Sequence, residues 1–294
     1  MPGKPSSPGL RFALDLIARS AFKPMVGIPQ KPLLAKPEEL AVTFIGHASF
    51  LIQLGGLRIL IDPVFANRLV LIRRLRKPGV LIRYLPPIDA VLLTHAHMDH
   101  LNLPSLRKVI RHSYRLSGRA PAAIVPEGVE DLVNRLGFES VLTMGWWSSR
   151  RLRQVEVVMT PAQHWGARML RDSHRGFGGY LLRAGSHSVY HSGDSGYFPG
   201  FSEIGNRLAP RVALLPIGAY NPDSFRRVHT SPEDALQAFQ DLNSECMIPM
   251  HYGTFCLSNE SMDEPLPRLM NAAAAAELTN RIQPLREGDT TIFP

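Results

Sequence analysis

Residues 94–100 read THAHMDH, so three histidines and one aspartate follow directly on a run of four apolar residues. In an extended segment, side chains two positions apart point the same way, so His95 and His97 can bind one metal ion together. Asp99 and His100 follow where the chain leaves the strand, and they can turn toward a second ion. Imidazole and carboxylate are ligand types for zinc, iron or manganese. A metal would also compensate the desolvation of four polar groups at the end of a buried strand.

Further ligands are expected where other apolar runs end. His164 ends VVMTPAQHW, Asp194 ends SVYHSGD and His251 ends CMIPMH. Polar residues at the mouths of strands are where the sites of α/β proteins collect. His191 is close to Asp194 but lies earlier in its strand, so we interpret it as structural.

The elements that would position these residues follow a repeated order of strands and then helices, which predicts two similar halves packed as a layered α/β domain. No low-complexity linker separates the halves, so residues 41–294 are predicted to form a single domain. Strands are expected within residues 41–62 and at 88–94, 122–126, 155–161, 178–185, 188–194, 211–218, 245–251 and 285–293, and helices at 103–114, 126–137, 230–242 and 267–278.

Residues 1–40 are predicted to be an N-terminal arm that contains one amphipathic helix at 10–22. Arg11, Asp15 and Arg19 would share one face of this helix, while Leu14 and Ile17 lie on another. The helix is expected to pack on the domain; the alternatives are a helix on a membrane surface or a contact within a homodimer.

The composition is that of a globular protein. The chain has 294 residues, of which 45% are hydrophobic and 20% are charged. We find no apolar stretch long enough for a transmembrane helix and no secretory signal, and the two cysteines form no disulfide framework, so a cytoplasmic location is expected. The net charge of +8 favours an anionic partner, such as a phosphate, a nucleic acid or an anionic membrane.

The motif HAHMDH with downstream histidine, aspartate and histidine resembles the metallo-β-lactamase superfamily, which implies a four-layer αβ/βα sandwich. More specifically, the chain is similar to the N-acyl-phosphatidylethanolamine-hydrolysing phospholipase D family and its bacterial relatives. The stretches that carry this resemblance run from about residue 41 to 257, and they read VTFIGHASFLIQLGGLRILIDPVF, LPPIDAVLLTHAHMDHL, PAQHWGAR, GDSGY, LPIGAYNP, HTSPEDA and MHYGTF.

The resemblance implies a site with two divalent metal ions, with zinc expected first and iron or manganese as alternatives. Asp194 would bridge the ions, and Asp99 and Asp194 are counted among the catalytic residues. A water or hydroxide between the ions would be the nucleophile. The expected ligands are His95, His97 and His164 for one ion and Asp99, His100 and His251 for the other.

Other residues are expected around the ligands. Asp62 is predicted to orient a ligand histidine, and the alternative is a turn aspartate before Pro63. His47, in GHAS, has the same two interpretations. Tyr220 and His229 are candidates to contact substrate oxygen or to protonate a leaving group, against a packed tyrosine and a histidine at a helix entry. Arg168 and Phe177 are expected on the substrate face.

The basic segment 67–84 contains six lysines and arginines and no acid, with leucines and isoleucines between them. One interpretation is peripheral contact with anionic lipid headgroups at the inner membrane surface, and the other is a solvated, partly packed loop.

The predicted function is therefore a dinuclear metal hydrolase that acts on phosphodiesters of phospholipid type. One alternative is a lactonase or esterase acting on a small molecule with the same metal chemistry. A second is a nuclease, which the charge suggests, although no interleaving of aromatic and basic residues typical of an RNA-binding module supports it. The chain departs from the family pattern at Phe177, Ser195 and 223–228, so the metal chemistry transfers to this chain and the lipid specificity does not.

Overall fold

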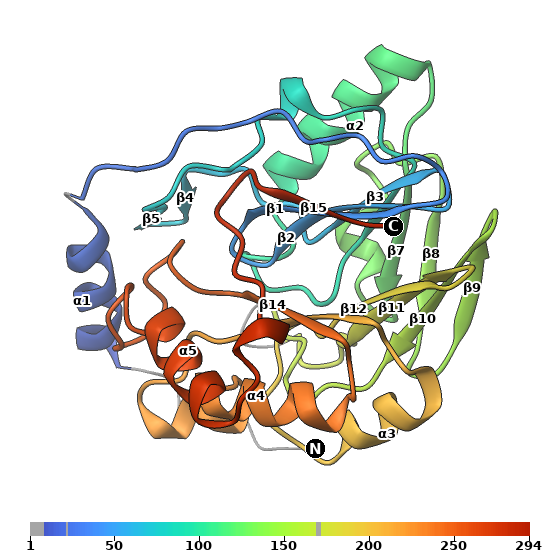
Figure 1. Ribbon diagram of the computed structural model, residues 1–294. Helices are drawn as coiled ribbons and strands as arrows, with labels where there is room; N and C mark the ends of the chain where they lie inside the picture. The colour runs from blue at the N-terminus through green and yellow to red at the C-terminus, as the bar shows by residue number, and fades with distance from the viewer. Residues whose placement is uncertain (1–8, 22, 169–171) are drawn as a thin grey trace.

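The computed structural model describes residues 9–21, 23–168 and 172–294, and its centre is a pair of β-sheets packed face to face (Figure 1). Strands β3, β6, β7 and β8 of the first sheet run parallel, as do β12, β13 and β14 of the second. The first sheet has the order β15 (Thr290–Phe293), β1 (Leu40–Gly46), β2 (Ser49–Leu54), β3 (Leu57–Ile61), β6 (Ala90–Leu92), β7 (Ala122–Pro126), β8 (Val141–Met144). The second has the order β14 (Cys246–Met250), β13 (Val212–Pro216), β12 (His187–His191), β11 (Gly179–Ala184), β10 (Val155–Thr160), β9 (Ser149–Leu152).

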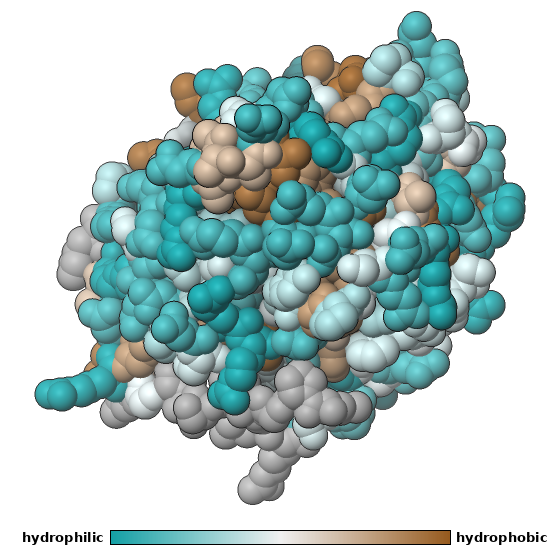
Figure 2. All heavy atoms as spheres, turned by 60° about the horizontal axis from the view of Figure 1, so that its bottom comes forward, coloured by the Kyte–Doolittle hydropathy of each residue, from teal (hydrophilic) through white to brown (hydrophobic). Residues whose placement is uncertain are grey.

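The hydrophobic core lies between the sheets, where residues such as Phe50 and Ile59 of the first sheet meet Tyr180 and Leu214 of the second. Helix α2 (Leu103–Ser117) covers the outer face of the first sheet, and α3 (Gly200–Leu208), α4 (Pro232–Asp241) and α5 (Pro265–Ala275) cover the second (Figure 1). This arrangement confirms the predicted four-layer αβ/βα sandwich. When the α3–α5 layer is turned toward the viewer, its surface is mostly hydrophilic (Figure 2).

Local signals explain where helices α2 and α4 begin. Asn102 accepts a hydrogen bond from the backbone N–H of Ser105 at the start of α2, and Gly118 ends that helix in the left-handed conformation. At α4, Ser231 and Asp234 form a reciprocal capping box, which lies within one turn of the chain.

The helix predicted for residues 126–137 is wrong, because only a short 3-10 turn at Glu130–Leu132 forms there. Gly128 adopts a φ of +77°, which takes the chain out of the helical region, and its carbonyl accepts a hydrogen bond from Arg175. The pattern also did not indicate β8, β9 or α3. Strand β9 lies at the edge of its sheet and exposes Arg150 and Arg151, so it lacks the apolar alternation that marks a half-buried strand.

Helix α1 (Leu10–Ala21) lies beside a small hairpin formed by β4 (Arg68–Leu69) and β5 (Ile72–Arg73), at one side of the sandwich (Figure 1). Its packed face differs from the one predicted, since Leu16 is buried and Leu14 is 56% exposed. The division at residue 40 stays a prediction. Among the described residues, no helix is long and apolar enough to cross a membrane.

Candidate metal centre

The predicted ligands come from loops that follow strands of both sheets, and the fold brings these loops together. The loop after β6 carries four of them, and one each follows β10, β12 and β14. The turn after β1 adds His47, and Asp62 follows β3. Because the parallel strands of each sheet end on the same side, polar residues far apart in sequence can meet at one site.

The first group contains His95, His97, His164 and Asp194, and the candidate ligand atoms of these residues lie within 4.8 Å of one another. His97 Nδ1 is 2.9 Å from His95 Nε2 and 3.2 Å from His164 Nε2. His95 and His164 are both almost completely buried. These are the residues predicted for the first metal ion, with Asp194 at their side.

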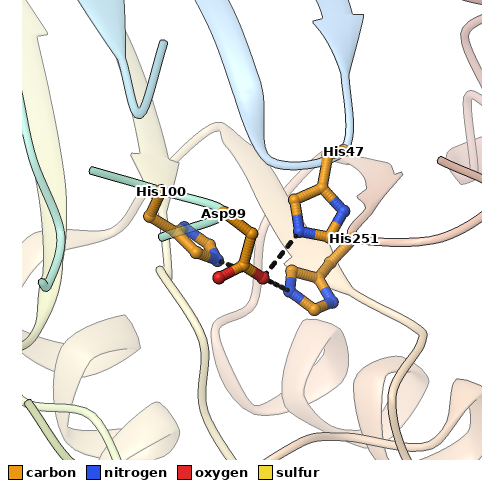
Figure 3. A group of neighbouring side chains, drawn as sticks. All are labelled: His47, Asp99, His100 and His251. Carbon is orange, nitrogen blue, oxygen red and sulfur yellow. Dashed lines mark hydrogen bonds and ion pairs between the residues drawn. The ribbon is translucent and has the colours of Figure 1, made fainter. Parts of the chain in front are cut away.

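The second group contains His47, Asp99, His100 and His251 (Figure 3). Asp99 Oδ2 is 3.5 Å from His251 Nε2 and 3.7 Å from His100 Nε2. His47 is the addition to the predicted set, because its Nε2 lies 3.0 Å from the same carboxylate oxygen. His47 is therefore placed to hydrogen-bond Asp99, whereas the sequence left open whether it orients a ligand histidine or occupies a turn.

A single oxygen of Asp194 lies between the two groups. Its Oδ2 is 3.1 Å from His251 Nε2 and 3.2 Å from His100 Nε2 on one side. On the other side, it is 3.9 Å from the Nε2 atoms of both His95 and His164. This is the position that the predicted bridging ligand needs.

Hydrogen bonds around the site fix which ring nitrogen is free in His95, His100 and His164. Asp62 Oδ2 accepts from His100 Nδ1 at 2.7 Å and from the Thr94 hydroxyl at 2.6 Å. The Thr94 oxygen in turn lies 2.9 Å from His95 Nδ1, and the Val228 carbonyl lies 2.9 Å from His164 Nδ1. In these three rings the Nδ1–H is thus used, and the Nε2 is left as a lone-pair ligand. Asp62 occupies the orienting position predicted for it.

The donor set fits a cation. Burial lowers the pKa of His95 and His164 well below the usual histidine value and that of His97 to about 4, so these rings are neutral and can act as ligands. His100 Nε2 and His251 Nε2 are buried and have no hydrogen-bond partner among the described residues. Lone pairs that face one another in a buried space are tolerable when a metal ion binds them.

The charges lead to the same conclusion. Burial would raise the pKa of Asp194, but His100 and His251 outweigh it and hold that pKa well below the usual value. Burial also opposes protonation of His251, yet Asp194 and Asp99 raise its pKa to about 9. Without a metal, protons on histidines balance the buried carboxylates, which is the charge that divalent ions would supply.

Three of the predicted substrate contacts have partners within the protein. The Tyr220 hydroxyl donates to Glu264 at 2.7 Å beside α5, so it is committed to a partner away from the ligands. Arg168 Nη1 donates to the carbonyls of Ala96 and Leu101, so it holds the ligand loop. Phe177 packs edge-on against the rings of Trp146 and His164 and supports a ligand.

His229 does lie at the site. Its Nε2 is 3.5 Å from Asp194 Oδ2, and its Nδ1 is buried without a hydrogen-bond partner among the described residues. His229 also lines a cavity of about 720 Å³ that reaches the two ligand groups through His97, Asp99 and Asp194. This volume is in the range of small-molecule sites.

Most of the wall of this cavity is apolar, and sequence reasoning missed its main residues. Trp165 follows the ligand His164 and lies edge-on to the His97 ring at 4.9 Å. Phe225 comes from the segment 223–228, which the sequence singled out only as a departure from the family pattern. Helix α1 and the β4–β5 hairpin supply much of the rest of the wall, although they are distant from the ligands in sequence.

We expect Asp62→Asn to weaken metal binding by about 10- to 100-fold, because an amide has one acceptor oxygen, whereas the two carboxylate oxygens accept from His100 Nδ1 and from the hydroxyl and the N–H of Thr94. The measurement is zinc affinity by competition with a chromogenic chelator. Asp89→Asn is the control, since Asp89 follows a strand-connecting loop and accepts a backbone hydrogen bond from Arg58 away from the site. Equal zinc affinities for the two variants would contradict the orienting role.

Comparison with known proteins places these residues in a family context. A model of the β-lactamase superfamily domain matches residues 57–252. The chain is 30% identical to the mitochondrial N-acyl-phosphatidylethanolamine-hydrolyzing phospholipase D of Saccharomyces cerevisiae, over 85% of this chain and 55% of that enzyme. It is 29% identical to a metal-dependent hydrolase of Caldivirga maquilingensis, over 85% of this chain and 97% of the relative.

Solved structures agree at the level of the fold. Igni18, a metallo hydrolase from Ignicoccus hospitalis, superposes with a TM-score of 0.67 at 24% identity, covering 87% of this chain and 99% of the other.

Proposed function

Because this chain belongs to the β-lactamase superfamily and is a metal-dependent hydrolase, we propose that it hydrolyses a phosphodiester in a phospholipid of the N-acyl-phosphatidylethanolamine type. The products would be phosphatidic acid and an N-acylethanolamine. The observation that carries this proposal is an apolar cavity that reaches the cluster of seven candidate ligands through His97, Asp99 and Asp194. Two relatives with about 30% identity that are named as phospholipases of this specificity support it.

We assign two divalent ions to the site, with zinc as the first choice. His95, His97 and His164 would hold one, Asp99, His100 and His251 the other, and Asp194 would bridge them. When bound, such a pair lowers the pKa of a water molecule and stabilises charge on a phosphoryl group.

The residues of the chain have distinct tasks in this proposal. Asp62 and Thr94 keep the ligand rings oriented through the hydrogen bonds described above. His229, at the floor of the cavity, has one buried ring nitrogen without a partner among the described residues and is placed to give a proton to the leaving oxygen. The apolar wall excludes water and holds the hydrocarbon part of the lipid.

The test is steady-state turnover of three substrates by zinc-reconstituted protein: a fluorescent N-acyl-phosphatidylethanolamine, bis(p-nitrophenyl) phosphate and a simple lactone. We expect the lipid to be turned over best, and chelator-treated protein is the blank. Efficient turnover of the lactone with neither phosphodiester cleaved would contradict the phospholipase proposal and leave a lactonase or esterase of the same metal chemistry.

We also propose that the mouth of the cavity rests on an anionic membrane. Val70 and Leu71, which line the cavity, are 72% and 59% exposed, and Arg68 beside them is exposed. The basic segment is less available than its sequence suggested. Arg74 is fully buried against Val64 and Phe255, and Arg76 pairs with Asp263 and Glu287.

Binding to vesicles tests this contact. Wild-type protein is expected to sediment with anionic vesicles and to be released by salt, because the Debye length is only about 8 Å at physiological ionic strength. Leu71→Asp should lower binding several-fold, whereas Leu116→Asp, at a similarly exposed leucine on α2, should not. Equal effects of the two variants, or equal binding to neutral vesicles, would contradict the assigned surface.

A further inference from the structure

Helix α1 is a wall of the cavity. Phe12, Ala13, Leu16 and Ile17 line the space, together with residues 69–72 of the hairpin. These four positions recur at the spacing of one helix face, while Leu14 points away and is 56% exposed. The helix therefore presents an apolar stripe to the cavity.

The C-terminal end of α1 is fixed to the domain by hydrogen bonds. Arg19 donates to the carbonyls of Ser258 and Glu260, both at 2.8 Å. Ser20 Oγ accepts from the Arg73 N–H, and the Arg73 guanidinium donates to the Ala21 carbonyl, which also suits the negative end of the helix. These contacts make α1 a defined part of the site.

The same contacts connect α1 to the floor of the cavity. The carboxylate of Glu260 accepts from the backbone N–H groups of Ala219 and Asn221, at 2.6 and 3.2 Å, and Ala219 lines the cavity. At the other end of the helix, Phe12 lies edge-on to Phe225 at 5.7 Å. Phe225 belongs to the turn that leads into Val228, whose carbonyl fixes His164.

The polarity of the cavity is graded along its length. Its deep end carries His97, Asp99, Asp194 and His229, and its walls toward solvent are apolar. Val70 and Leu71 line the cavity and are also exposed, so the outer end opens to solvent between the hairpin and α1. A ligand that matches this gradient has a polar head and a hydrocarbon tail.

We infer that α1 forms the binding wall for a single aliphatic chain, and that Phe12 and Ile17 determine which chain lengths are accepted. The placement of the polar head rests on the proposed hydrolysis at the metal centre, whereas binding of the tail does not. The tail lies against the stripe of α1, facing the hairpin and Phe225. Each buried methylene is expected to strengthen binding about three- to four-fold.

The experiment measures binding and needs no turnover. N-acylethanolamines with acyl chains of 6 to 12 carbons, kept below their aggregation limits, are titrated into zinc-reconstituted protein by calorimetry, without vesicles. Trp165, which lines the cavity, gives a second signal through its fluorescence. Wild-type affinity is expected to rise with each added methylene.

Ile17→Trp places a larger ring in the cavity and should weaken binding of the 12-carbon ligand at least tenfold, with a smaller effect on the 6-carbon ligand. Leu14→Trp is the matched control on the outward face of α1, and its affinities should stay within twofold of wild type. Phe12→Ala removes apolar contact area from the same wall and should weaken long-chain binding about fivefold. Because it adds no bulk, it tests the same wall if Ile17→Trp does not fold.

An affinity that does not depend on chain length, or equal effects of Ile17→Trp and Leu14→Trp, would overturn the assignment of α1. If the chain-length dependence appears but no phosphodiester is hydrolysed, the aliphatic site stands and the proposed reaction fails. If a phosphodiester is hydrolysed without any chain-length dependence, the reaction stands and the role of α1 fails.

Discussion

Asp194→Asn is expected to lower turnover about 10³-fold and to reduce the bound metal from two ions toward one. Its Oδ2 lies between both ligand groups, so the substitution removes the one negative charge that both ions would share. A catalytic cation contributes several kcal/mol to the transition state, and about 1.4 kcal/mol corresponds to a factor of ten in rate. The amide has nearly the same shape as the carboxylate, so the change tests charge.

Turnover and elemental analysis of the purified variant are measured together. Asp241→Asn is the control, because Asp241 is a carboxylate at the end of α4 that bonds Tyr197 and Gln237 away from the site. Wild-type metal content with wild-type turnover in Asp194→Asn would show that Asp194 is not a bridging ligand.

Removal of the metal is expected to lower the thermal midpoint of unfolding by about 10 °C. An ion present at a thousand times its dissociation constant stabilises the folded state by about 4 kcal/mol, and each kcal/mol shifts the midpoint by a few degrees in a chain of this size. The loss of stability is larger because, without the metal, no cation compensates the desolvation of Asp99, Asp194 and the six buried or half-buried histidines around them.

The midpoint is followed by circular dichroism after dialysis against EDTA, and then again after zinc is restored. EDTA that has been saturated with zinc beforehand is the control for effects of the chelator itself. An unchanged midpoint after verified removal of the metal would contradict a site that is built around cations.

The cluster of candidate ligands could be predicted from sequence because the signal of each residue is local. Each follows an apolar strand, and the two-residue period of a strand decides that His95 and His97 point the same way. Ser231 and Asp234 likewise act within one turn of chain, so the cap of α4 was predictable. The order of strands and helices then limited the fold to a layered sandwich.

Side-chain positions that depend on contacts between distant segments could not be predicted from the sequence pattern. The sequence placed Tyr220 and Arg168 on the substrate face of the site. In the structure, the Tyr220 hydroxyl donates to Glu264, and the Arg168 guanidinium donates to two carbonyls of the loop that carries the candidate ligands. Gly128 ended a helix that its neighbours favoured. For Tyr220 and Arg168 a partner far along the chain outweighed the local preference, and at Gly128 the positive φ of the glycine did.

The sequence by itself determined the metal chemistry of this protein, since the types of its ligands and their places at strand ends are properties of short segments. Only the tertiary structure decided what surrounds that chemistry. Phe12 of α1, Leu71 of the hairpin and Phe225 are separated by at least 59 residues, and none of them belongs to a motif. They meet because apolar surface is buried wherever packing allows it, a nondirectional interaction that leaves no fixed spacing in the sequence.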